Sequence, residues 1–305
     1  MSKGLPDISV ILVSWNTRDL LLNCLASLPD ALGSLQAEVW IVDNGSTDGS
    51  VEAIRAKHPD VHVIANDRNV GFAAANNQAI VASQGRYVLL LNSDTVTLQG
   101  SIERLVRFAD TKPALGMVGP MLQNPNGSFQ GSYAQQPSLR SELLSATGLG
   151  IRLYGPWYPN ASPRQSQEKR QVGYIQGACM LVRREAIEQA GMFDEGYFMY
   201  SEEPDWCLRM QRSGWEVWYL PEAHIIHYGG QSTQQVRPEM VRTLYRSKIR
   251  FFRKHYGALP AFLLRVMLYI ILRCKWMLLR LTKMYQSSGA QVAVRWRDLR
   301  DPEPG

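Results

Sequence analysis

A parallel β-sheet covered on both faces by α-helices is the fold that the amino-acid sequence predicts. Short apolar runs alternate with stretches of helical periodicity up to about residue 119. Gly and Ser mark the passages between these runs, as at 49–50, 71 and 100–101. With 305 residues and 45% apolar content, the chain can bury a full core. We therefore expect one α/β domain with an appendage.

The predicted elements follow one another in the order that such a sheet requires. Strands are expected near Val10, Val39, Val61, Val88 and Met117. A helix is expected over residues 17–28, and its Leu21, Leu25 and Leu28 fall on one stripe. The segment from Asn124 to Gly127 is typical of a hairpin turn, and a mobile loop is expected over 154–170. The remaining elements are a strand over 173–182, helices over 183–190 and 204–213, and a strand over 216–220.

Charge is distributed unevenly along the chain. Residues 237–305 hold 15 Lys and Arg against 4 Asp and Glu, a net charge of +11, whereas residues 1–236 carry −5. Such a basic tail is typical of contact with anionic lipid, nucleic acid or an acidic partner. The four cysteines are far apart and form no metal-ligand spacing, so we expect reduced, mostly buried thiols. The apolar run 8–15 lacks the features of an export signal, which favours a cytoplasmic location.

Polar side chains follow four consecutive strands of the predicted sheet. They stand in the segments 14–16, 43–48, 66–69 and 92–94. Ligands of open parallel sheets bind beyond the carboxyl ends of the strands, so these loops predict a binding site rather than plain turns. Neither G-x-x-x-x-G-K-[ST] nor G-x-G-x-x-G occurs, which disfavours a Walker ATPase and a standard dinucleotide oxidoreductase.

Asp94 is the first candidate for chemistry, because it follows the unbroken apolar run from Val88 to Leu91. A carboxylate at the edge of a sheet can ligate Mg²⁺ or Mn²⁺ that bridges two phosphates, since phosphates and water fill the remaining positions. Taken alone, Asp94 fits a turn or helix-capping aspartate equally well.

An acidic cluster of Glu202, Glu203 and Asp205 surrounds Pro204. Pro suits the first turn of a helix, so Glu203 is expected at a helix N-terminus, where free amides keep a carboxylate ionised. An ionised carboxylate is what a general base needs to take a proton from a hydroxyl. Helix capping is the alternative, and it explains one carboxylate more easily than three.

His227 stands close to a Gly-Gly turn at 229–230. In that position a histidine can ligate a metal through its neutral ring or approach a phosphate closely. His224, in contrast, is expected to be structural.

Taken in order, these motifs resemble those of the inverting glycosyltransferases of family 2, and within that family the bacterial rhamnosyltransferases. The resemblance covers roughly residues 7–235 and is specific as an ordered set. It rests on the segments 13–16, 43–50, 69–77, 91–95, 177–184, 202–209 and 227–232.

The resemblance implies a GT-A fold, a Rossmann-like and mostly parallel sheet flanked by helices. The catalytic domain would be residues 1–236, followed by a basic helical tail, 237–305. Asp43 would contact the nucleoside base, Arg68 would lie near the nucleotide, and Asp94 and His227 would bind the metal. The other residues expected around the donor are Ser14, Asn16, Asn44, Asn69, Gly71, Asn76 and Asn92.

Two positions depart from the family pattern. Asn92 stands where the family carries the first aspartate of its D-x-D element, so metal binding is expected to be weaker or to depend more on His227. Glu202-Glu203 stands where Glu-Asp is common. By position Glu203 is the expected base, with Glu202 and Asp205 as alternatives.

The activity implied by the resemblance is transfer of a sugar from a nucleoside-diphosphate donor to a hydroxyl of a cell-surface polysaccharide or lipid-linked glycan. A single displacement would invert the anomeric carbon. We expect dTDP-rhamnose as the donor, with a UDP-sugar of galactose, galactofuranose or GlcNAc as the alternative. Two other classes stay open: a catalytically silent sugar- or nucleotide-binding protein, and a nucleotidyltransferase, although no Gly-rich loop follows Val13.

The apolar segment 259–285 of the tail is interrupted by basic residues on one side of a helix. These are Arg265, Arg273, Lys275, Arg280 and Lys283, and the opposite side carries Leu263, Met267, Ile270, Cys274 and Leu281. The charges disfavour a transmembrane span and predict a helix lying on the inner face of an anionic membrane, near a lipid-linked acceptor. Packing on the catalytic domain or on another subunit of a homo-oligomer is the alternative, and no nucleic-acid partner is expected.

Overall fold

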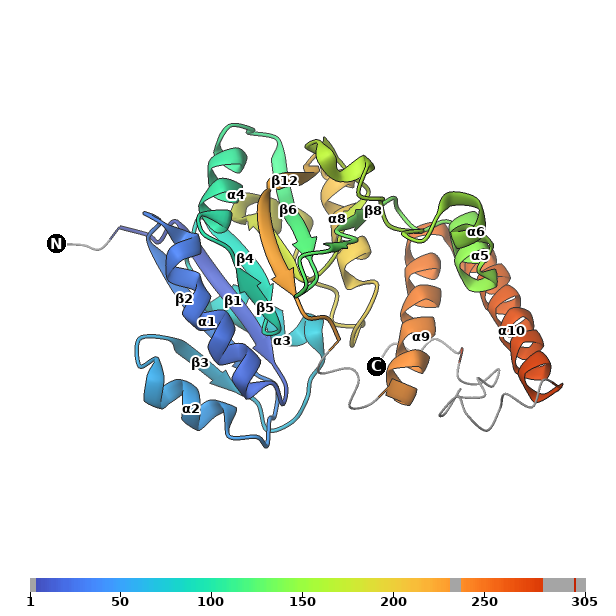
Figure 1. The fold of residues 1–305 in the computed structure, drawn as a ribbon, viewed down its shortest axis with the longest axis horizontal. Helices are drawn as coiled ribbons and strands as arrows, with labels where there is room; N and C mark the ends of the chain where they lie inside the picture. Colours follow the sequence, from blue (N-terminus) through green and yellow to red (C-terminus); the bar gives the residue numbers. More distant parts are fainter. Residues whose placement is uncertain (1–3, 231–236, 282–298, 300–305) are drawn as a thin grey trace.

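The computed structural model describes residues 4–230, 237–281 and 299. Its centre is a ten-stranded sheet with the strand order β3-β2-β1-β4-β11-β6-β12-β5, to which β7 and β9 add short pairings (Figure 1). The pairs from β3 to β4 and the pair β6–β12 are parallel. Strand β11 is antiparallel to both of its neighbours, and β5 is antiparallel to β12. The predicted fold class is confirmed.

Twelve strands and ten α-helices make up the described part of the chain. The strands are β1 (Ile8–Ser14), β2 (Ala37–Asp43), β3 (His62–Ala65), β4 (Tyr87–Asn92), β5 (Thr95–Thr97), β6 (Leu115–Gln123), β7 (Phe129–Gln130), β8 (Tyr133–Ala134), β9 (Arg170–Gln171), β10 (Tyr174–Ile175), β11 (Cys179–Arg183) and β12 (Glu216–His227). The helices are α1 (Arg18–Leu32), α2 (Ser50–Lys57), α3 (Phe72–Ala82), α4 (Ser101–Asp110), α5 (Leu139–Thr147), α6 (Leu149–Tyr154), α7 (Arg184–Ala190), α8 (Glu202–Arg212), α9 (Arg237–Tyr256) and α10 (Ala258–Leu281).

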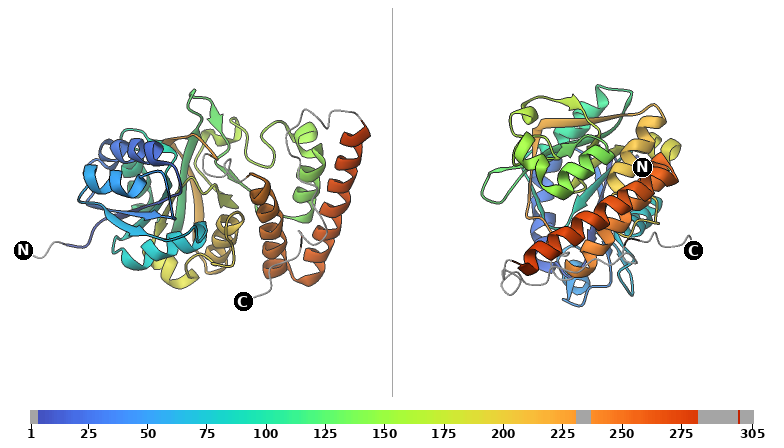
Figure 2. Two further views of the ribbon diagram at one scale, coloured as in Figure 1. Left: turned by 90° about the horizontal axis from the view of Figure 1, so that it is seen from below. Right: turned by 90° about the vertical axis from the view of Figure 1, so that its right-hand side faces the viewer.

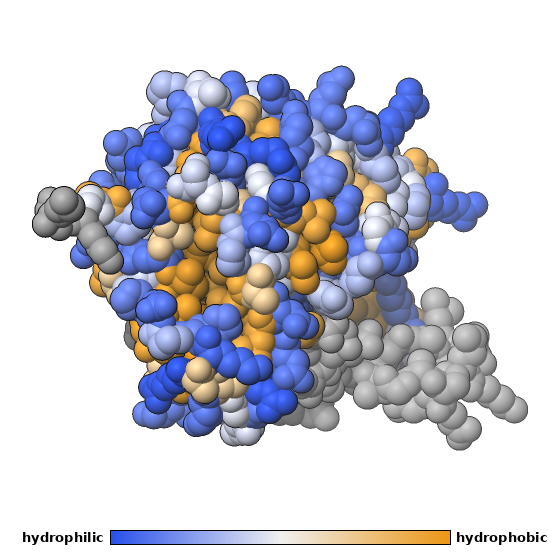
Figure 3. Space-filling model, turned by 60° about the vertical axis from the view of Figure 1, so that its left-hand side comes forward, coloured by the Kyte–Doolittle hydropathy of each residue, from blue (hydrophilic) through white to orange (hydrophobic). Residues whose placement is uncertain are grey.

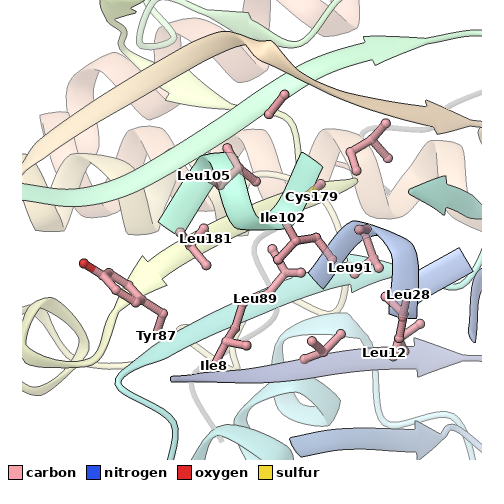
Figure 4. Packing of buried hydrophobic residues seen from close by; sticks show 14 of the residues in the cluster. Ile8, Leu12, Leu28, Tyr87, Leu89, Leu91, Ile102, Leu105, Cys179 and Leu181 are labelled. Carbon is pink, nitrogen blue, oxygen red and sulfur yellow. The ribbon is translucent and has the colours of Figure 1, made fainter. Parts of the chain in front are cut away.

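Both faces of the sheet are buried beneath helices, which explains the unbroken apolar runs of its central strands. Leu89 and Leu91 of β4 pack against helices α1 and α4 on one face (Figure 4). Leu90 of β4 packs on the other face, in a cluster with residues of α3, α7 and α8. Successive side chains of a strand point to opposite faces, so a strand covered on both sides needs an apolar residue at nearly every position. On the face shown in Figure 3, hydrophobic residues gather around a hollow in the middle and hydrophilic residues surround them.

Several elements differ in length from the prediction. Helix α1 continues past Leu28 to Leu32 and ends at Gly33, which has a positive φ of 57°. The predicted strand 173–182 is two strands, β10 and β11, separated by a short connection that approaches α8. Strand β12 continues beyond Leu220 to His227, because its last residues pair with β5.

The segment 121–172 contains more structure than the sequence indicates. The predicted hairpin is present, with the Asn124 amide donating to the Ser128 carbonyl across the turn at 2.8 Å. Within the expected loop 154–170, residues 155–164 form turns and loop, but a 3-10 helix (Gln165–Gln167) and the start of β9 follow them. Helices α5 and α6 precede this loop and were not predicted, because α5 packs its Leu139 and Ala146 on the C-terminal helices and not on the sheet.

The four cysteines are all free. Cys24, Cys179 and Cys207 are buried and Cys274 is exposed, so the prediction of reduced, mostly buried thiols is confirmed. Burial raises the pKa of Cys24 and of Cys207 to about 12, which keeps both thiols protonated and unreactive at neutral pH.

Helices α9 and α10 form a helical hairpin around Gly257 at one end of the molecule, with α10 outermost (Figure 2). They share a core of Ile249, Phe251, Phe252, Leu264 and Leu268, which also includes Tyr197 from the loop before α8. The predicted helix 259–285 therefore exists up to Leu281, while Lys283 and the expected end at Tyr285 lie outside the described residues. Over the stretches that the structure describes, none of the helices combines the length and the apolar character that crossing a bilayer requires.

Asp205 joins α9 to the rest of the protein. Its fully buried carboxylate accepts from Arg209 at 2.9 Å, from Lys254 at 2.8 Å and from His255 at 2.7 Å. Lys254 and His255 belong to α9, whereas Asp205 and Arg209 belong to α8. Burial by itself raises the pKa of Asp205, but the hydrogen bonds from His255, Lys254 and Arg209 outweigh it and hold this pKa well below its usual value.

We predict that Asp205→Ala lowers the free energy of unfolding by about 3 kcal/mol, because it removes the acceptor of a buried ionic network. Urea denaturation followed by circular dichroism measures this loss. Asp19→Ala is the matched control, since its pair with Arg18 is exposed and is expected to contribute less than about 1 kcal/mol. Equal losses in the two variants would contradict this role for Asp205.

The same carboxylate predicts a pH dependence of stability. The pKa of Asp205 is lower in the folded protein than in the unfolded chain, so its contribution is present above about pH 4 and is lost as the pH falls further. Wild type is therefore expected to lose more stability than Asp205→Ala between pH 5 and pH 3, as measured by thermal melts. Parallel losses would show that other groups dominate acid unfolding.

Candidate active site

A cleft of about 890 Å³ lies at the carboxyl-terminal edge of the parallel strands. Residues from many parts of the chain line it, among them the ends of β1, β2, β4 and β12, the loop before α3, the hairpin at β7, the connection between β10 and β11, the start of α8, and α9. The candidate residues among them are Asn44, Asn69, Asn92, Asp94, Glu202, Glu203 and His227. The two acidic motifs and the histidine, far apart in sequence, therefore share one cavity.

Pairing between β5 and β12 brings Asp94 to His227. His227 pairs with Thr95 in the antiparallel register, and the amide of Tyr228 donates to the Asp94 carbonyl at 2.9 Å. The His227 Nε2 atom then lies 3.3 Å from Asp94 Oδ1. The Asn92 amide nitrogen approaches the same Nε2 atom at 3.5 Å.

The chemistry of these side chains fits a divalent cation. A carboxylate oxygen and an imidazole nitrogen are ligands that Mn²⁺ accepts, and Mg²⁺ takes the oxygen. No group of three or more His, Cys, Asp or Glu residues suited to a metal occurs in the part of the chain that the structure describes. A cation held by Asp94 and His227 would therefore complete its coordination with water and substrate oxygens, as hard cations bound beside phosphates commonly do.

A sharp turn presents the glutamates to the cleft. Tyr200 and Ser201 both have positive φ, 69° and 65°, a conformation that non-glycine residues rarely adopt and that tends to occur at functional sites. Helix α8 begins directly after them, so Glu202 and Glu203 stand in its first turn. The Glu203 Oε1 atom accepts from the Gly177 amide at 3.2 Å. A Cβ atom at position 177 would lie 2.6 Å from that oxygen, so a larger residue there would displace the Glu203 carboxylate.

The two glutamates differ in how well their charges are stabilised. Burial raises the pKa of Glu202 well above its usual value, and the neighbouring Glu203 raises it further. Burial also raises the pKa of Glu203, but its carboxylate receives the Gly177 hydrogen bond. The buried Glu202 Oε2 atom has no hydrogen-bond partner. Because two adjacent carboxylates cannot both ionise easily, the Gly177 hydrogen bond favours the charged form of Glu203 over that of Glu202.

Asp205 does not line the cleft. It belongs to the same turn of α8, but its carboxylate is bound by Arg209 of α8 and by Lys254 and His255 of α9. Its position therefore favours Glu203 and Glu202 over Asp205 as the base, and the sequence offered no sign of this because His255 lies 50 residues further along the chain.

The loops that carry Asn44 and Asn69 form one side of the cleft, called here the asparagine side. The Asn44 amide nitrogen donates to the Asn69 side-chain oxygen at 3.0 Å and to the Gly71 carbonyl at 3.2 Å. Gly71 itself lies outside the lining, but a Cβ atom there would come within 2.6 Å of the Phe198 carbonyl. The Phe72 amide donates to that same carbonyl at 2.7 Å, which ties the loop to the segment before α8.

The remaining expected donor contacts, Ser14, Asn16, Asp43, Arg68 and Asn76, do not line the cleft. Ser14 bonds to Thr17, Asn16 accepts from the Thr47 amide, and Asn76 donates to the Phe72 carbonyl of its own helix. These hydrogen bonds hold the loops behind the cleft, and the role of the three residues as donor contacts stays a prediction.

Asp43 and Arg68 lie near this asparagine side without reaching the lining. One oxygen of the buried Asp43 carboxylate accepts from the Ser46 amide at 2.9 Å, while its Oδ1 atom has no hydrogen-bond partner. Arg68 is exposed, and its backbone packs against Gly45.

Several lining residues were missed by sequence reasoning. Helix α9 contributes Glu239, Met240, Thr243 and Arg246, and the β-hairpin contributes Gln130. The sequence placed α9 beyond a domain boundary, and its basic composition carried no sign that one of its faces would meet the cleft. Only the packing of α9 on α8 reveals this.

The chain matches known protein families and structures over most of its length. Glycosyl transferase family 2 matches residues 9–191, and Glycosyl transferase family group 2 matches residues 157–300. The chain is 33% identical over 245 residues to the N-acetylglucosaminyl-diphospho-decaprenol L-rhamnosyltransferase of Mycobacterium tuberculosis. The aligned region covers 74% of this chain and 77% of that protein. It is 24% identical over 189 residues to the rhamnosyltransferase WbbL of Escherichia coli, covering 59% and 69% of the two chains.

Among solved structures, the mannosyltransferase PcManGT from Pyrobaculum calidifontis, in complex with GDP-Man and Mn²⁺, has a similar fold. The TM-score is 0.53 at 15% identity, and the similarity covers 97% of this chain and 84% of that one. A family match over more than half of the chain, joined to this sheet and its cleft, identifies the protein as a glycosyltransferase of family 2 with the GT-A fold, related to rhamnosyltransferases.

Proposed function

We propose that this enzyme transfers L-rhamnose from dTDP-rhamnose to a hydroxyl of a lipid-linked glycan, with inversion at the anomeric carbon. The observation that carries the proposal is the convergence of Asp94, His227 and the Glu202–Glu203 pair on one cleft of about 890 Å³. The choice of sugar and acceptor is supported by the mycobacterial relative, whose name specifies L-rhamnose and a diphospho-decaprenol acceptor.

Each group has a distinct task in this reaction. Asp94 and His227 would hold Mn²⁺ or Mg²⁺, which supplies positive charge to the departing diphosphate. Glu203 takes the proton from the acceptor hydroxyl as that oxygen attacks the anomeric carbon. Glu202 stays protonated beside it, which keeps the charge of the pair on the base. A single displacement of this kind inverts the configuration of the sugar.

The nucleotide would lie along the asparagine side of the cleft. Asn44 and Asn69 line the cleft there, and Asn92 lines it next to His227. The buried Asp43 Oδ1 atom, which has no protein donor, suits the ring N–H of a thymine or uracil base. The resulting site suits dTDP and UDP alike, so a UDP-sugar donor is the alternative within the same fold.

Donor choice is tested by thermal shift with dTDP, UDP, GDP and their sugars, with and without Mn²⁺. We expect dTDP-rhamnose with Mn²⁺ to raise the melting temperature most, because a ligand that binds only the folded protein stabilises it by mass action. Preference for a UDP-sugar would support the alternative donor. Release of pyrophosphate from a nucleoside triphosphate, or no transfer with any donor, would overturn the proposal in favour of a nucleotidyltransferase or a silent binding protein.

The base is tested with Glu203→Gln, which we expect to lower kcat by about 10³-fold and to leave dTDP-rhamnose affinity unchanged. Glu202→Gln is the matched control, and because Glu202 already carries the proton, a much smaller loss is expected. The pKa of Glu203 is raised above the usual 4.5, so activity is expected to fall as the pH drops through a value above 4.5. Initial rates of transfer from pH 4 to pH 9 measure this loss of activity at low pH. A larger loss in Glu202→Gln would reverse the two roles.

We also propose that the C-terminal hairpin docks the enzyme on the inner face of an anionic membrane. Leu264 and Leu268 of α10 are buried against α9, but Leu259, Leu263 and Ile270 are 46–67% exposed. They are separated by whole helical turns, so they form one unpartnered apolar stripe on α10. The exposed Arg273 and Lys275 follow this stripe. An apolar stripe with basic residues is the pattern of a helix at an anionic bilayer surface.

Membrane docking is tested with the triple variant Leu259→Glu, Leu263→Glu, Ile270→Glu. We expect it to lower partitioning onto phosphatidylglycerol vesicles at low salt by about tenfold. Val81→Glu is the control, since Val81 is 71% exposed on α3, away from the hairpin. If wild type stays off the vesicles and forms a dimer that the triple variant loses, the stripe is a subunit interface instead.

A further inference from the structure

The proposed metal ligand His227 is held by a residue to which the sequence gave no role. Gln130, on β7, also lines the cleft. Its side-chain nitrogen donates to the His227 carbonyl at 3.3 Å and to the Asn124 side-chain oxygen at 3.1 Å. A backbone carbonyl can only accept, so the nitrogen of the Gln130 amide must face it. The Oε1 atom of Gln130 is thereby left to face the imidazole ring.

This orientation of Gln130 decides which ring nitrogen of His227 carries the proton. Gln130 Oε1 lies 2.8 Å from His227 Nδ1. An amide oxygen only accepts, so Nδ1 must donate and must carry the hydrogen. In a neutral ring the other nitrogen, Nε2, then carries a lone pair and no hydrogen. Nε2 lies 3.3 Å from Asp94 Oδ1 and has only one long contact with a donor, the Asn92 side-chain nitrogen at 3.5 Å.

Two acceptors at that separation repel each other unless a cation or a hydrogen-bond donor lies between them. If Gln130 did not hold the proton on Nδ1, the neutral ring would gain most by moving it to Nε2 and donating to the Asp94 carboxylate. That hydrogen bond would occupy one lone pair on each proposed metal ligand at once. The hydrogen bond between His227 Nδ1 and Gln130 Oε1 opposes the formation of this Nε2–Asp94 hydrogen bond.

We propose that Gln130 is a positioning residue that keeps the proton of His227 on Nδ1, so that Nε2 and the Asp94 carboxylate remain open to a divalent cation. The inference rests on the proposed function only for the cation, because the state of the ring exists without any metal. Hydrogen bonds of this outer kind fix the orientation and tautomer of metal-ligating histidines, and losing one typically costs 10–100-fold in metal affinity.

The first test reads the ring directly in the metal-free, full-length protein labelled with ¹⁵N-histidine. Long-range ¹H–¹⁵N spectra at about pH 8, where an ordinary histidine is neutral, distinguish the two tautomers. We expect the Nδ1–H form in wild type and the Nε2–H form in Gln130→Ala. Gln130→Glu keeps an acceptor facing Nδ1 but loses both donated hydrogen bonds, so it should retain the Nδ1–H form.

The second test measures Mn²⁺ affinity from the electron paramagnetic resonance signal of the free ion. We expect Gln130→Ala to weaken Mn²⁺ binding by about tenfold and Gln130→Glu to bind at least as tightly as wild type. Gln123→Ala is the matched control, because Gln123 approaches His224 at 3.4 Å in a similar Gln–His pair that does not line the cleft. It should change neither the His227 tautomer nor the Mn²⁺ affinity.

The outcomes separate this inference from the proposed function. An Nε2–H ring in wild type, or an unchanged tautomer and Mn²⁺ affinity in Gln130→Ala, overturns the role of Gln130. Equal loss of Mn²⁺ affinity in Gln130→Ala and Gln130→Glu also overturns it, since hairpin anchoring would then be the cause. If wild type binds no Mn²⁺, the metal part of the proposed function fails, while the tautomer spectra still decide the role of Gln130.

Discussion

The antiparallel pairing of β5 with β12 is the constraint on which the candidate active site depends. Strand β4 ends at Asn92, the chain turns within two residues, and β5 pairs with β12 as the last strand of the sheet, four positions away from β4 in the strand order. This pairing places Asp94 Oδ1 3.3 Å from His227 Nε2, although 133 positions separate the two residues in the sequence. The backbone hydrogen bonds on either side fix both residues, so the proposed metal ligands sit on rigid elements.

Helix α8 illustrates how environment assigns different tasks to identical chemistry. Its first turn carries three carboxylates, all shielded from water to a large degree. Glu203 receives a backbone hydrogen bond and faces the cleft, and Glu202 lies beside it with a strongly raised pKa. Asp205 instead contacts Arg209, Lys254 and His255. One turn of helix therefore serves both the proposed proton transfer and the attachment of the C-terminal hairpin.

Helix α9 connects the cleft to the outer surface of the protein. One side of it meets Asp205 and lines the cavity, and another packs on α10, whose opposite side is apolar and exposed. Helix α9 thus joins the proposed membrane surface to the cleft. This arrangement would suit an acceptor whose lipid end stays in the bilayer while its sugar end reaches Glu203.

The sequence by itself determined the fold class and the polar motifs that meet in the cleft. Unbroken apolar strands require helices on both faces, and the polar loops behind them must gather at one edge of a parallel sheet. Those are consequences of local periodicity and strand direction, so Asn44, Asn69, Asn92 and Asp94 could be placed without coordinates. Glu203 and His227 came from motif order and residue chemistry.

Only the tertiary structure decided the orientation and the partners of these side chains. Asp205 and Glu203 look alike in the sequence, and their separation depends on Lys254 and His255, which approach from another helix. Gln130 and the residues of α9 carry no local signal, because their contacts cross between distant elements. Long-range packing sets which carboxylate is ionised and which ring nitrogen is open, and periodicity along a chain contains no information about that.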